Sequence, residues 1–239
     1  MANNSSRVLI IIPARNEAPN IAGVLASAKV KCPSVDILVV NDASEDATGE
    51  IARKHGVNVL DMPFRLGIGG AMQTGFIYAA QNRYDIAVQL DGDGQHDPSE
   101  IKTLIGPLLS GEADVAIGSR FLGKGGYRPD FAHRLGCGIL SKLLSFFTGN
   151  KITDPTSGFR VANRAVINFY AEDYPVDYPE PEAIILLSRK GFRIKEIPTV
   201  MARRQSGESS IIGLHAVYYM IKVMLAICIA AISRKNRKG

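Results

Sequence analysis

The feature that most constrains the fold is a unit repeated through the first half of the chain, a short apolar run followed by a helix-like segment. The apolar runs cover residues 8–12, 37–40, 57–60, 86–90 and 115–117. They are rich in Val, Ile and Leu without strict alternation, which is typical of strands covered on both faces. The helix-like segments cover residues 18–29, 47–55, 69–81 and 99–109. Repeated strand–helix units predict an α/β fold with a mainly parallel sheet and helices on both faces.

After Arg120 the pattern becomes less regular. We expect a glycine-rich loop at 123–130, an amphipathic helix at 131–148, a turn into a short strand at 154–160, a helix at 179–190 and a late strand at 192–197. The chain has 239 residues, 46% of them hydrophobic, and no low-complexity tract or fixed-period repeat. That is enough apolar material for one large core, so residues 1–210 are predicted to form a single domain.

The cysteines and the N-terminus indicate a reducing compartment. Cys32, Cys137 and Cys228 form no closely spaced set, and an odd number cannot all pair within one chain. We expect small buried thiols rather than disulfides. The chain is polar up to Ser6 and then enters an apolar run, so we expect no signal peptide and a location on the cytoplasmic side.

Positive charge is concentrated near the C-terminus. From Met201 onward there are seven Lys or Arg residues against one acid, Glu208, which leaves the first 200 residues close to neutral. A near-neutral body argues against nucleic-acid binding, which needs basic residues across a folded face. A basic end is suited to anionic lipid.

Residues 211–232 form an apolar stretch of membrane-spanning length that contains His215 and, near its middle, Lys222. A charge at the bilayer centre costs about 2.5–3.5 kcal/mol. We therefore expect 211–239 to form an amphipathic, membrane-associating helix with a basic tail. A spanning helix and a soluble docking or oligomerisation helix are the alternatives, so a homo-oligomer stays open.

Polar clusters follow the predicted strands at 13–17, 41–44, 91–95 and 118–120. In such sheets ligands bind at the carboxyl ends of the strands, so these clusters should lie along one edge. Turn and capping functions explain Ser44, Asp46 and Ser99. They do not explain the gathering of side chains that bind charge, namely Arg15, Asp91, Asp93 and Arg120.

The sharpest of these clusters is Asp91-Gly92-Asp93. Two carboxylates two residues apart, with a glycine for the turn, suit one divalent ion held against a diphosphate. Gln95 adds an oxygen and His96 a nitrogen, and the hard oxygen ligands favour Mg²⁺ or Mn²⁺ over zinc. A calcium loop of the EF-hand type is excluded because its twelfth position would be Lys102 instead of glutamate.

Six segments in order resemble the family 2 glycosyltransferases of the GT-A fold, in the branch of dolichyl-phosphate mannose synthase and bacterial polyprenyl-phosphate glycosyltransferases. They are Ile12-Pro13-Ala14-Arg15-Asn16-Glu17, residues 65–71, Leu90-Asp91-Gly92-Asp93-Gly94-Gln95-His96, Gly118-Ser119-Arg120, Asp154-Pro155-Thr156-Ser157-Gly158-Phe159-Arg160 and residues 204–210. The resemblance spans about residues 8–210 and implies a GT-A, Rossmann-like fold.

The resemblance also implies roles in binding a nucleotide-sugar donor. Contacts to base, ribose, diphosphate and metal would come from Pro13, Ala14, Arg15, Glu17, Asp42, Arg65, Gly67, Asp91, Gly92, Asp93 and Arg204. Asp93 and Gln95 would bind the metal directly, with Asp91 near the ribose and the metal. This chain has Asn41-Asp42-Ala43-Ser44 where the family usually has two aspartates and a glycine, so the base stays open between uracil and guanine.

For the acceptor, the resemblance matches Arg120 and Arg134 to a pair that holds a lipid phosphate, and guanidinium groups bind phosphate in a bidentate manner. Asp154 closes the second half of the site, and it is the best base if the acceptor is a hydroxyl. Asp91, Asp93, Asp154 and Arg120 are thus the expected catalytic residues. Glu180 and Glu182 are candidates for contacts to sugar hydroxyls or are ordinary helix carboxylates.

The function implied is inverting, metal-dependent transfer of a hexose from a UDP- or GDP-linked sugar to a polyprenyl phosphate, for cell-envelope glycan assembly. The alternatives are a transferase acting on a polysaccharide or glycolipid hydroxyl, and an inactive nucleotide-sugar-binding membrane adaptor. A nucleotidyltransferase is disfavoured because the first loop is not glycine-rich. The sequence does not reveal the sugar.

Overall fold

The computed structural model describes residues 6–123, 131–201 and 222–229. These residues contain a seven-stranded sheet in the order β3-β2-β1-β4-β6-β5-β7. Its strands are β1 (Val8–Ala14), β2 (Asp36–Asn41), β3 (Asn58–Asp61), β4 (Ile86–Gln89), β5 (Val115–Ser119), β6 (Arg160–Asn163) and β7 (Ile194–Pro198). All neighbouring strands are parallel except β6, which is antiparallel to both β4 and β5.

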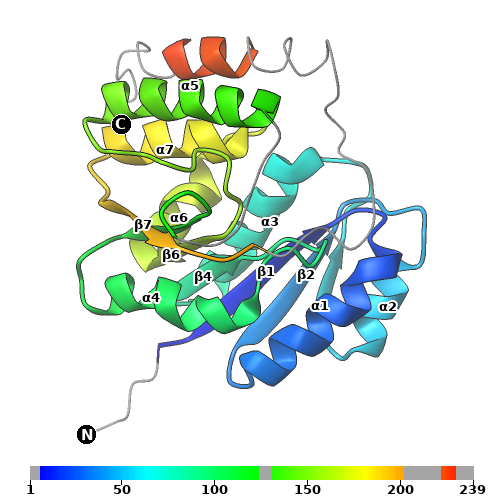
Figure 1. Cartoon of the computed structure of the whole chain (residues 1–239). Helices are drawn as coiled ribbons and strands as arrows, with labels where there is room; N and C mark the ends of the chain where they lie inside the picture. The colour runs from blue at the N-terminus through cyan, green and yellow to red at the C-terminus, as the bar shows by residue number, and fades with distance from the viewer. Residues whose placement is uncertain (1–5, 124–130, 202–221, 230–239) are drawn as a thin grey trace, which may run out of the picture.

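Helices cover both faces of the sheet (Figure 1). They are α1 (Ala18–Lys31), α2 (Thr48–Lys54), α3 (Gly67–Gln81), the short 3-10 helix η1 (Pro98–Glu100), α4 (Ile101–Leu109), α5 (Phe131–Thr148), α6 (Arg164–Glu172) and α7 (Pro179–Arg189). The predicted α/β class is confirmed, and so are the strands and helices predicted between residues 8 and 197, within a few residues. Helix α6 was not predicted from the sequence. It starts after Asn163, whose side chain accepts a hydrogen bond from the N–H of Val166.

Alternate residues of β1 are buried in two different cores, which explains its unbroken apolar sequence. Leu9 and Ile11 belong to the core beneath α3, α5, α6 and α7. Ile10 and Ile12 belong to the core beneath α1, α2 and α4. All four side chains are fully buried. Burial of each contributes about 1.5–3 kcal/mol, so the covering of both faces rather than local propensity fixes this strand.

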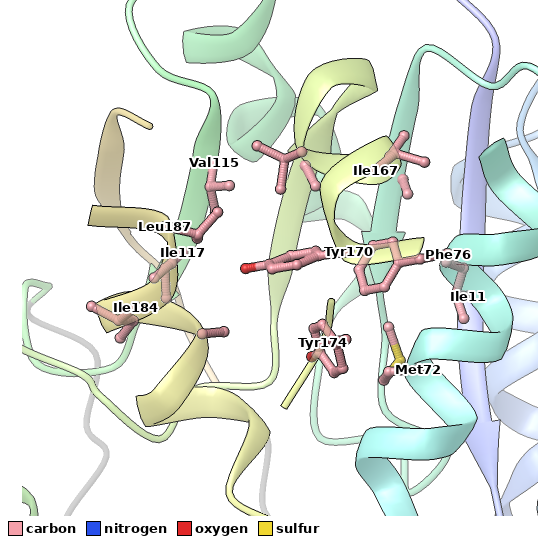
Figure 2. Packing of buried hydrophobic residues seen from close by; sticks show 14 of the residues in the cluster. Ile11, Met72, Phe76, Val115, Ile117, Ile167, Tyr170, Tyr174, Ile184 and Leu187 are labelled. Atoms are coloured by element: carbon pink, nitrogen blue, oxygen red, sulfur yellow. The ribbon is translucent and has the colours of Figure 1, made fainter. Parts of the chain in front are cut away.

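Aromatic rings fill the space between α3 and α6 (Figure 2). The ring of Phe76 lies 4.9 Å from that of Tyr170 and 5.3 Å from that of Tyr174, and the two tyrosine rings are 4.8 Å apart. Such contacts add to the free energy of area burial. They hold α3 against α6, and the N-terminal end of α3 reaches the carboxyl edge of the sheet.

The C-terminal helical segment 222–229 packs on the body of the protein near α5 (Figure 1). Val223 and Ile227, one helical turn apart, are fully buried in the same core as Leu140 and Leu144 of α5. Leu225 and Ile229 are exposed. In the described part of the chain, no helix is long and apolar enough to cross a membrane. Most of the predicted helix 211–232 and the basic tail lie outside the described residues.

Candidate active site

A cavity of about 450 Å³ lies at the carboxyl edge of the sheet, where β1, β2 and β4 end and α3 and α7 begin. The cavity contains most of the predicted donor-binding residues. Its lining consists of Pro13, Ala14, Arg15, Glu17, Asp42, Arg65, Gly67, Ile68, Ala71, Asp91, Gly92, Asp93 and Glu180. Every predicted donor-binding residue that the structure describes is in this set. Arg204 lies outside the described residues, as does the loop 124–130.

Arg15 is held over the loop that follows β2. Its Nη1 donates to the carbonyl oxygens of Asp42, at 3.2 Å, and of Ala43, at 3.4 Å. Its Nη2 lies 3.4 Å from a carboxylate oxygen of Glu45. The guanidinium therefore has a fixed place at the end of the cavity where β1 and β2 terminate.

Asp42 connects the end of β2 to the start of α3. Its carboxylate accepts hydrogen bonds from the backbone N–H groups of Leu66, at 2.6 Å, and Gly67, at 2.9 Å. A negative charge at a helix N-terminus is stabilised by the exposed N–H groups and the helix dipole. Asp42 is thus partly committed to holding α3, and its predicted contact with the base stays a prediction.

The acidic turn after β4 has the expected position. Asp91 and Asp93 line the cavity, and Gly94 has a φ of 78°, which favours glycine. The backbone N–H of Gln95 donates to Oδ1 of Asp93 at 3.0 Å. Gln95 itself is not among the lining residues. Gly158 approaches this turn closely, because a Cβ built there would lie 3.0 Å and 3.1 Å from the carboxylate oxygens of Asp91.

His96 lies beneath the turn instead of in the cavity. Its ring is 4.8 Å from that of Phe159 and stacked on it, and its side chain is 1% exposed. Nδ1 accepts the backbone N–H of Asp91 at 3.3 Å, and Nε2 is 3.6 Å from Oδ2 of the same residue. Burial lowers the pKa of His96 to about 4, so the ring is neutral near pH 7.

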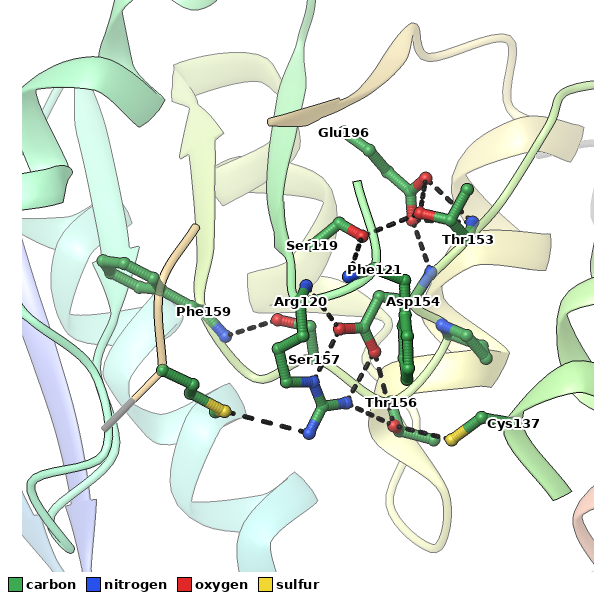
Figure 3. Close-up of polar contacts among 12 residues, drawn as sticks. Ser119, Arg120, Phe121, Cys137, Thr153, Asp154, Thr156, Ser157, Phe159 and Glu196 are labelled. Carbon is green, nitrogen blue, oxygen red and sulfur yellow. Dashed lines mark hydrogen bonds and ion pairs between the residues drawn. The ribbon is translucent and has the colours of Figure 1, made fainter. Parts of the chain in front are cut away.

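Arg120 and Asp154 form a buried ion pair beyond the acidic turn (Figure 3). Asp154 accepts from the backbone N–H, Nε and Nη2 of Arg120 at 3.0, 2.6 and 2.6 Å. Nη2 of Arg120 also donates to Thr156, and Nη1 lies 3.8 Å from Sδ of Met201. Asp154 is fully buried and is not in the cavity lining, so its main role is to hold Arg120.

The loop that carries Asp154 is itself held by Glu196 of β7 (Figure 3). The Glu196 carboxylate accepts from the backbone N–H groups of Thr153 and Asp154 and from the Thr153 hydroxyl, at 2.7–3.0 Å. The Thr153 hydroxyl also contacts that of Ser119, at the end of β5. Glu196 was not singled out in the sequence, because its role depends on the pairing of β5 with β7.

Arg134 is exposed in the first turns of α5. Three residues later, Cys137 on the same helix is buried with its Sγ 3.6 Å from Oγ1 of Thr156, the residue that also binds Arg120. Residues three apart are neighbours on a helix, so Arg134 lies about one turn from the contact between Cys137 and Thr156. The predicted pairing of the two arginines for one phosphate remains a prediction.

Glu180 and Arg160 are polar residues with little sequence signal. Glu180 lines the cavity from the first turn of α7, and burial raises the pKa of its carboxyl. Arg160 is 6% exposed, and among the described residues its Nη1 has no hydrogen-bond partner. Its Nε donates to the carbonyl of Ser157 at 2.8 Å. Arg160 pairs across strands with Gln89 of β4, the strand that leads into the turn with Asp91.

The chemistry of the cavity fits a divalent metal ion. Asp91 and Asp93 offer hard carboxylate oxygens on its wall. Within residues 6–123, 131–201 and 222–229 no three potential ligand side chains cluster. Mg²⁺ is commonly bound by one or two carboxylates together with substrate phosphates, so two ligands from the turn are consistent with it.

The fold defines the class of protein. A structure of glucosyl-3-phosphoglycerate synthase from Mycobacterium tuberculosis, in complex with Mn²⁺, UDP-glucose and phosphoglyceric acid, matches with a TM-score of 0.74 at 22% identity. The match covers 98% of this chain and 83% of that one. The chain therefore has the GT-A fold of a glycosyltransferase, and at this identity the likeness extends to the fold alone.

Sequence relatives give the family. The model for glycosyl transferase family 2 matches residues 9–171. Polyprenol monophosphomannose synthase of Mycolicibacterium smegmatis is 32% identical over 92% of this chain and 86% of its own. Undecaprenyl-phosphate mannosyltransferase of Micrococcus luteus is 31% identical over 87% of this chain and 88% of its own. The chain belongs to glycosyltransferase family 2, in the branch that contains these enzymes, and is a glycosyltransferase.

Proposed function

We propose that this glycosyltransferase transfers a hexose, with inversion, from a UDP- or GDP-linked sugar to a polyprenyl phosphate. The product would be a lipid-phosphate-linked sugar for cell-envelope glycan assembly. The observation that carries the proposal is the cavity that gathers the donor loop, the acidic turn and Arg65. Relatives named for polyprenol and undecaprenyl-phosphate mannosyl transfer support the acceptor and make mannose the first sugar to test.

The charge of the cavity supports metal dependence. Acidic side chains outnumber arginines in its lining, where Glu17, Asp42, Asp91, Asp93 and Glu180 face only Arg15 and Arg65. A nucleotide diphosphate is itself anionic and would be repelled there without a cation. Asp91, Asp93 and Gln95 would hold Mg²⁺ or Mn²⁺. When bound, the ion would stabilise the charge that develops on the leaving diphosphate.

A phosphate acceptor suits the remaining residues. Its oxygen is already anionic near neutral pH and can attack the anomeric carbon opposite the leaving diphosphate, so no strong base is needed. Positioning and electrostatic stabilisation then carry the catalysis. Arg120, oriented by Asp154, and Arg134 would bind the acceptor phosphate.

Transfer to a hydroxyl would require a carboxylate base. Asp154 is poorly suited to that task, since it is buried and accepts three hydrogen bonds from Arg120. Glu180 is the carboxylate that lines the cavity from α7, and it would be the base in this second candidate function. An inactive adaptor is disfavoured by the assembled donor cavity.

We place the enzyme at the cytoplasmic face of the membrane, where a polyprenyl phosphate resides. Apolar side chains of α5 are exposed at Leu135, Ile139 and Phe146, and Leu225 and Ile229 are exposed on the segment 222–229. Together with the basic residues near the C-terminus, such surfaces fit an interfacial helix on anionic lipid.

Arg134 offers the cleanest test of the acceptor assignment. Arg120→Ala would leave Asp154 as a buried unpaired charge and destabilise the fold, whereas Arg134 is exposed. Arg134→Ala should raise the KM for undecaprenyl phosphate about tenfold or more, since one charge-assisted phosphate contact is lost, with little change in the KM for the nucleotide-sugar. Lys142→Ala, an exposed cation on the same helix, is the control and should change neither. Equal effects of Arg134→Ala on both substrates, or none, would contradict the acceptor assignment.

A further inference from the structure

His96 has contacts with both halves of the site. On the donor side its ring touches the backbone and side chain of Asp91, as described above. On the other side its backbone forms an isolated antiparallel bridge with Met201. Sδ of Met201 in turn accepts from Nη1 of Arg120 at 3.8 Å. One residue therefore links the metal-binding turn to the acceptor arginine.

The hydrogen bond between Nδ1 and the Asp91 amide fixes the tautomer of the His96 ring. Because Nδ1 accepts the N–H of Asp91, the proton of the neutral imidazole is on Nε2. Nε2 has no hydrogen-bond partner among the described residues, and it faces Oδ2 of Asp91 at 3.6 Å. The ring thus holds the amide of Asp91 with one hydrogen bond and lies against its carboxylate.

Stability alone does not explain a histidine at this position. The ring is stacked on Phe159 and its side chain is 1% exposed. A phenylalanine would keep the stacking and remove a buried N–H that has no full hydrogen bond, which is a costly group to bury. Compared with a phenylalanine, the imidazole adds only its hydrogen bond to the Asp91 amide and its close approach to the Asp91 carboxylate.

We propose that His96 is a positioning residue: its buried ring sets the Asp91-Gly92-Asp93 turn, and its backbone bridge to Met201 holds the sulfur that contacts the guanidinium of Arg120. The inference rests on the proposed function for the identity of the two substrates. It predicts that loss of the imidazole weakens binding of the metal and nucleotide, although His96 is not among the residues that line the cavity.

Three substitutions of His96 test the contributions of the ring, of Nδ1 and of Nε2 separately. His96→Phe keeps the ring and its volume and removes both nitrogens. His96→Asn places an amide oxygen near the position of Nδ1, and His96→Gln places its amide near Nε2. Leu104→Ala is the matched control, since Leu104 is fully buried in the same core as Phe159 and remote from the cavity lining.

The measurements are the Kd of Mn²⁺ with UDP or GDP by calorimetry, the KM for undecaprenyl phosphate, and the melting temperature. We expect His96→Phe and His96→Gln to weaken the Kd about tenfold, because a small displacement of a positioned group has a large effect. The KM for undecaprenyl phosphate should stay within about threefold of wild type, because the backbone bridge to Met201 remains. His96→Asn should stay within about threefold of wild type, as its oxygen still accepts the Asp91 N–H. Leu104→Ala should lower the melting temperature and leave both constants unchanged.

Met201→Leu tests the second half of the link. It keeps the volume and removes the sulfur that accepts from Arg120, so only the KM for undecaprenyl phosphate should rise. A wild-type Kd in both His96→Phe and His96→Gln would overturn the proposal, as would changes no larger than those of Leu104→Ala. The Kd of Mn²⁺ with UDP or GDP is measured without an acceptor, so a wrong acceptor assignment would not alter that result.

Discussion

At the residue scale, Arg120 and Asp154 illustrate how contacts assign roles that residue types leave open. Asp154 is fully buried, and its carboxylate is occupied by the Arg120 side chain and backbone. Breaking a buried ion pair by removing one partner leaves an uncompensated charge and costs about 3–5 kcal/mol. A loss of activity after substitution of Arg120 or of Asp154 could therefore come from unfolding as well as from catalysis. Substitution of an exposed residue such as Arg134 gives clearer evidence.

Gly158 is the residue where the smallest change should have a specific effect. A Cβ there would lie 3.0–3.2 Å from the Asp91 carboxylate and Nε2 of Gln89, closer than ordinary contacts. Gly158→Ala should displace the carboxylate and lower kcat/KM for the nucleotide-sugar by about 10- to 100-fold. Steady-state kinetics with varied donor would measure it.

Gly23→Ala is the control, because a Cβ at Gly23 meets nothing within 4 Å and the residue lies inside α1. It should stabilise the fold by up to about 1 kcal/mol without changing activity. Full activity of Gly158→Ala would show that the Asp91 carboxylate does not need its observed position.

At the scale of elements, β7 contributes to the site through Glu196 without reaching the cavity. Glu196→Ala removes the acceptor for two backbone N–H groups and a hydroxyl of the 153–154 segment. We expect a loss of about 2 kcal/mol in unfolding free energy and a higher KM for the lipid phosphate, because Asp154 no longer orients Arg120 firmly. Denaturant unfolding and acceptor kinetics measure the two effects.

Lys195→Ala on the same strand is the matched control for Glu196→Ala. Lys195 pairs with Glu112 on the surface, and both side chains are about half exposed. Its removal should change stability by at most about 0.5 kcal/mol and leave kinetics unchanged. An acceptor KM that responds equally to both variants would rule out a positioning role for Glu196.

The stability of the sheet edge formed by β5, β6 and β7 should also depend on pH. Asp114 accepts hydrogen bonds from the Arg193 side chain, which lower the pKa of its carboxyl below the usual 3.8. A depressed carboxyl pKa stabilises the fold above the unfolded-state value, and this contribution is lost as the pH falls through about 4.

Asp114→Asn should therefore cost about 1 kcal/mol at pH 7, a modest figure because Arg193 is largely exposed, and less at pH 3. Urea unfolding at both pH values tests this. A difference between variant and wild type that stays constant with pH would show that the ion pair does not contribute.

For the whole molecule, periodicity in the sequence predicted the elements better than their arrangement. The doubly covered β1 could be recognised because Leu9 and Ile10 face different cores and both are apolar. The antiparallel position of β6 between β4 and β5 could not be recognised from the sequence, because Arg160–Asn163 is short and its place depends on pairing with both of these strands.

Some residues of the site could likewise be predicted from the sequence, and others could not. Residues directly after strands, such as Arg15 and Asp93, were predictable because parallel strands end at one edge. Glu196 was not predicted, because its position follows from the pairing of β7. For Glu180 the sequence left open a contact to sugar hydroxyls or an ordinary helix carboxylate, and the packing of α7 places it in the cavity lining. His96 was expected near the metal, and the structure places it beneath the turn as a buried support.

The most direct test of the account is to identify the product. Purified protein would be incubated with Mn²⁺, a panel of UDP- and GDP-linked sugars, and either undecaprenyl phosphate or undecaprenol, with the lipids analysed by mass spectrometry. The account predicts a hexosyl undecaprenyl phosphate with one donor, its loss on addition of EDTA, and no product from undecaprenol. Transfer to undecaprenol, or no glycosylated lipid with any donor, would contradict it.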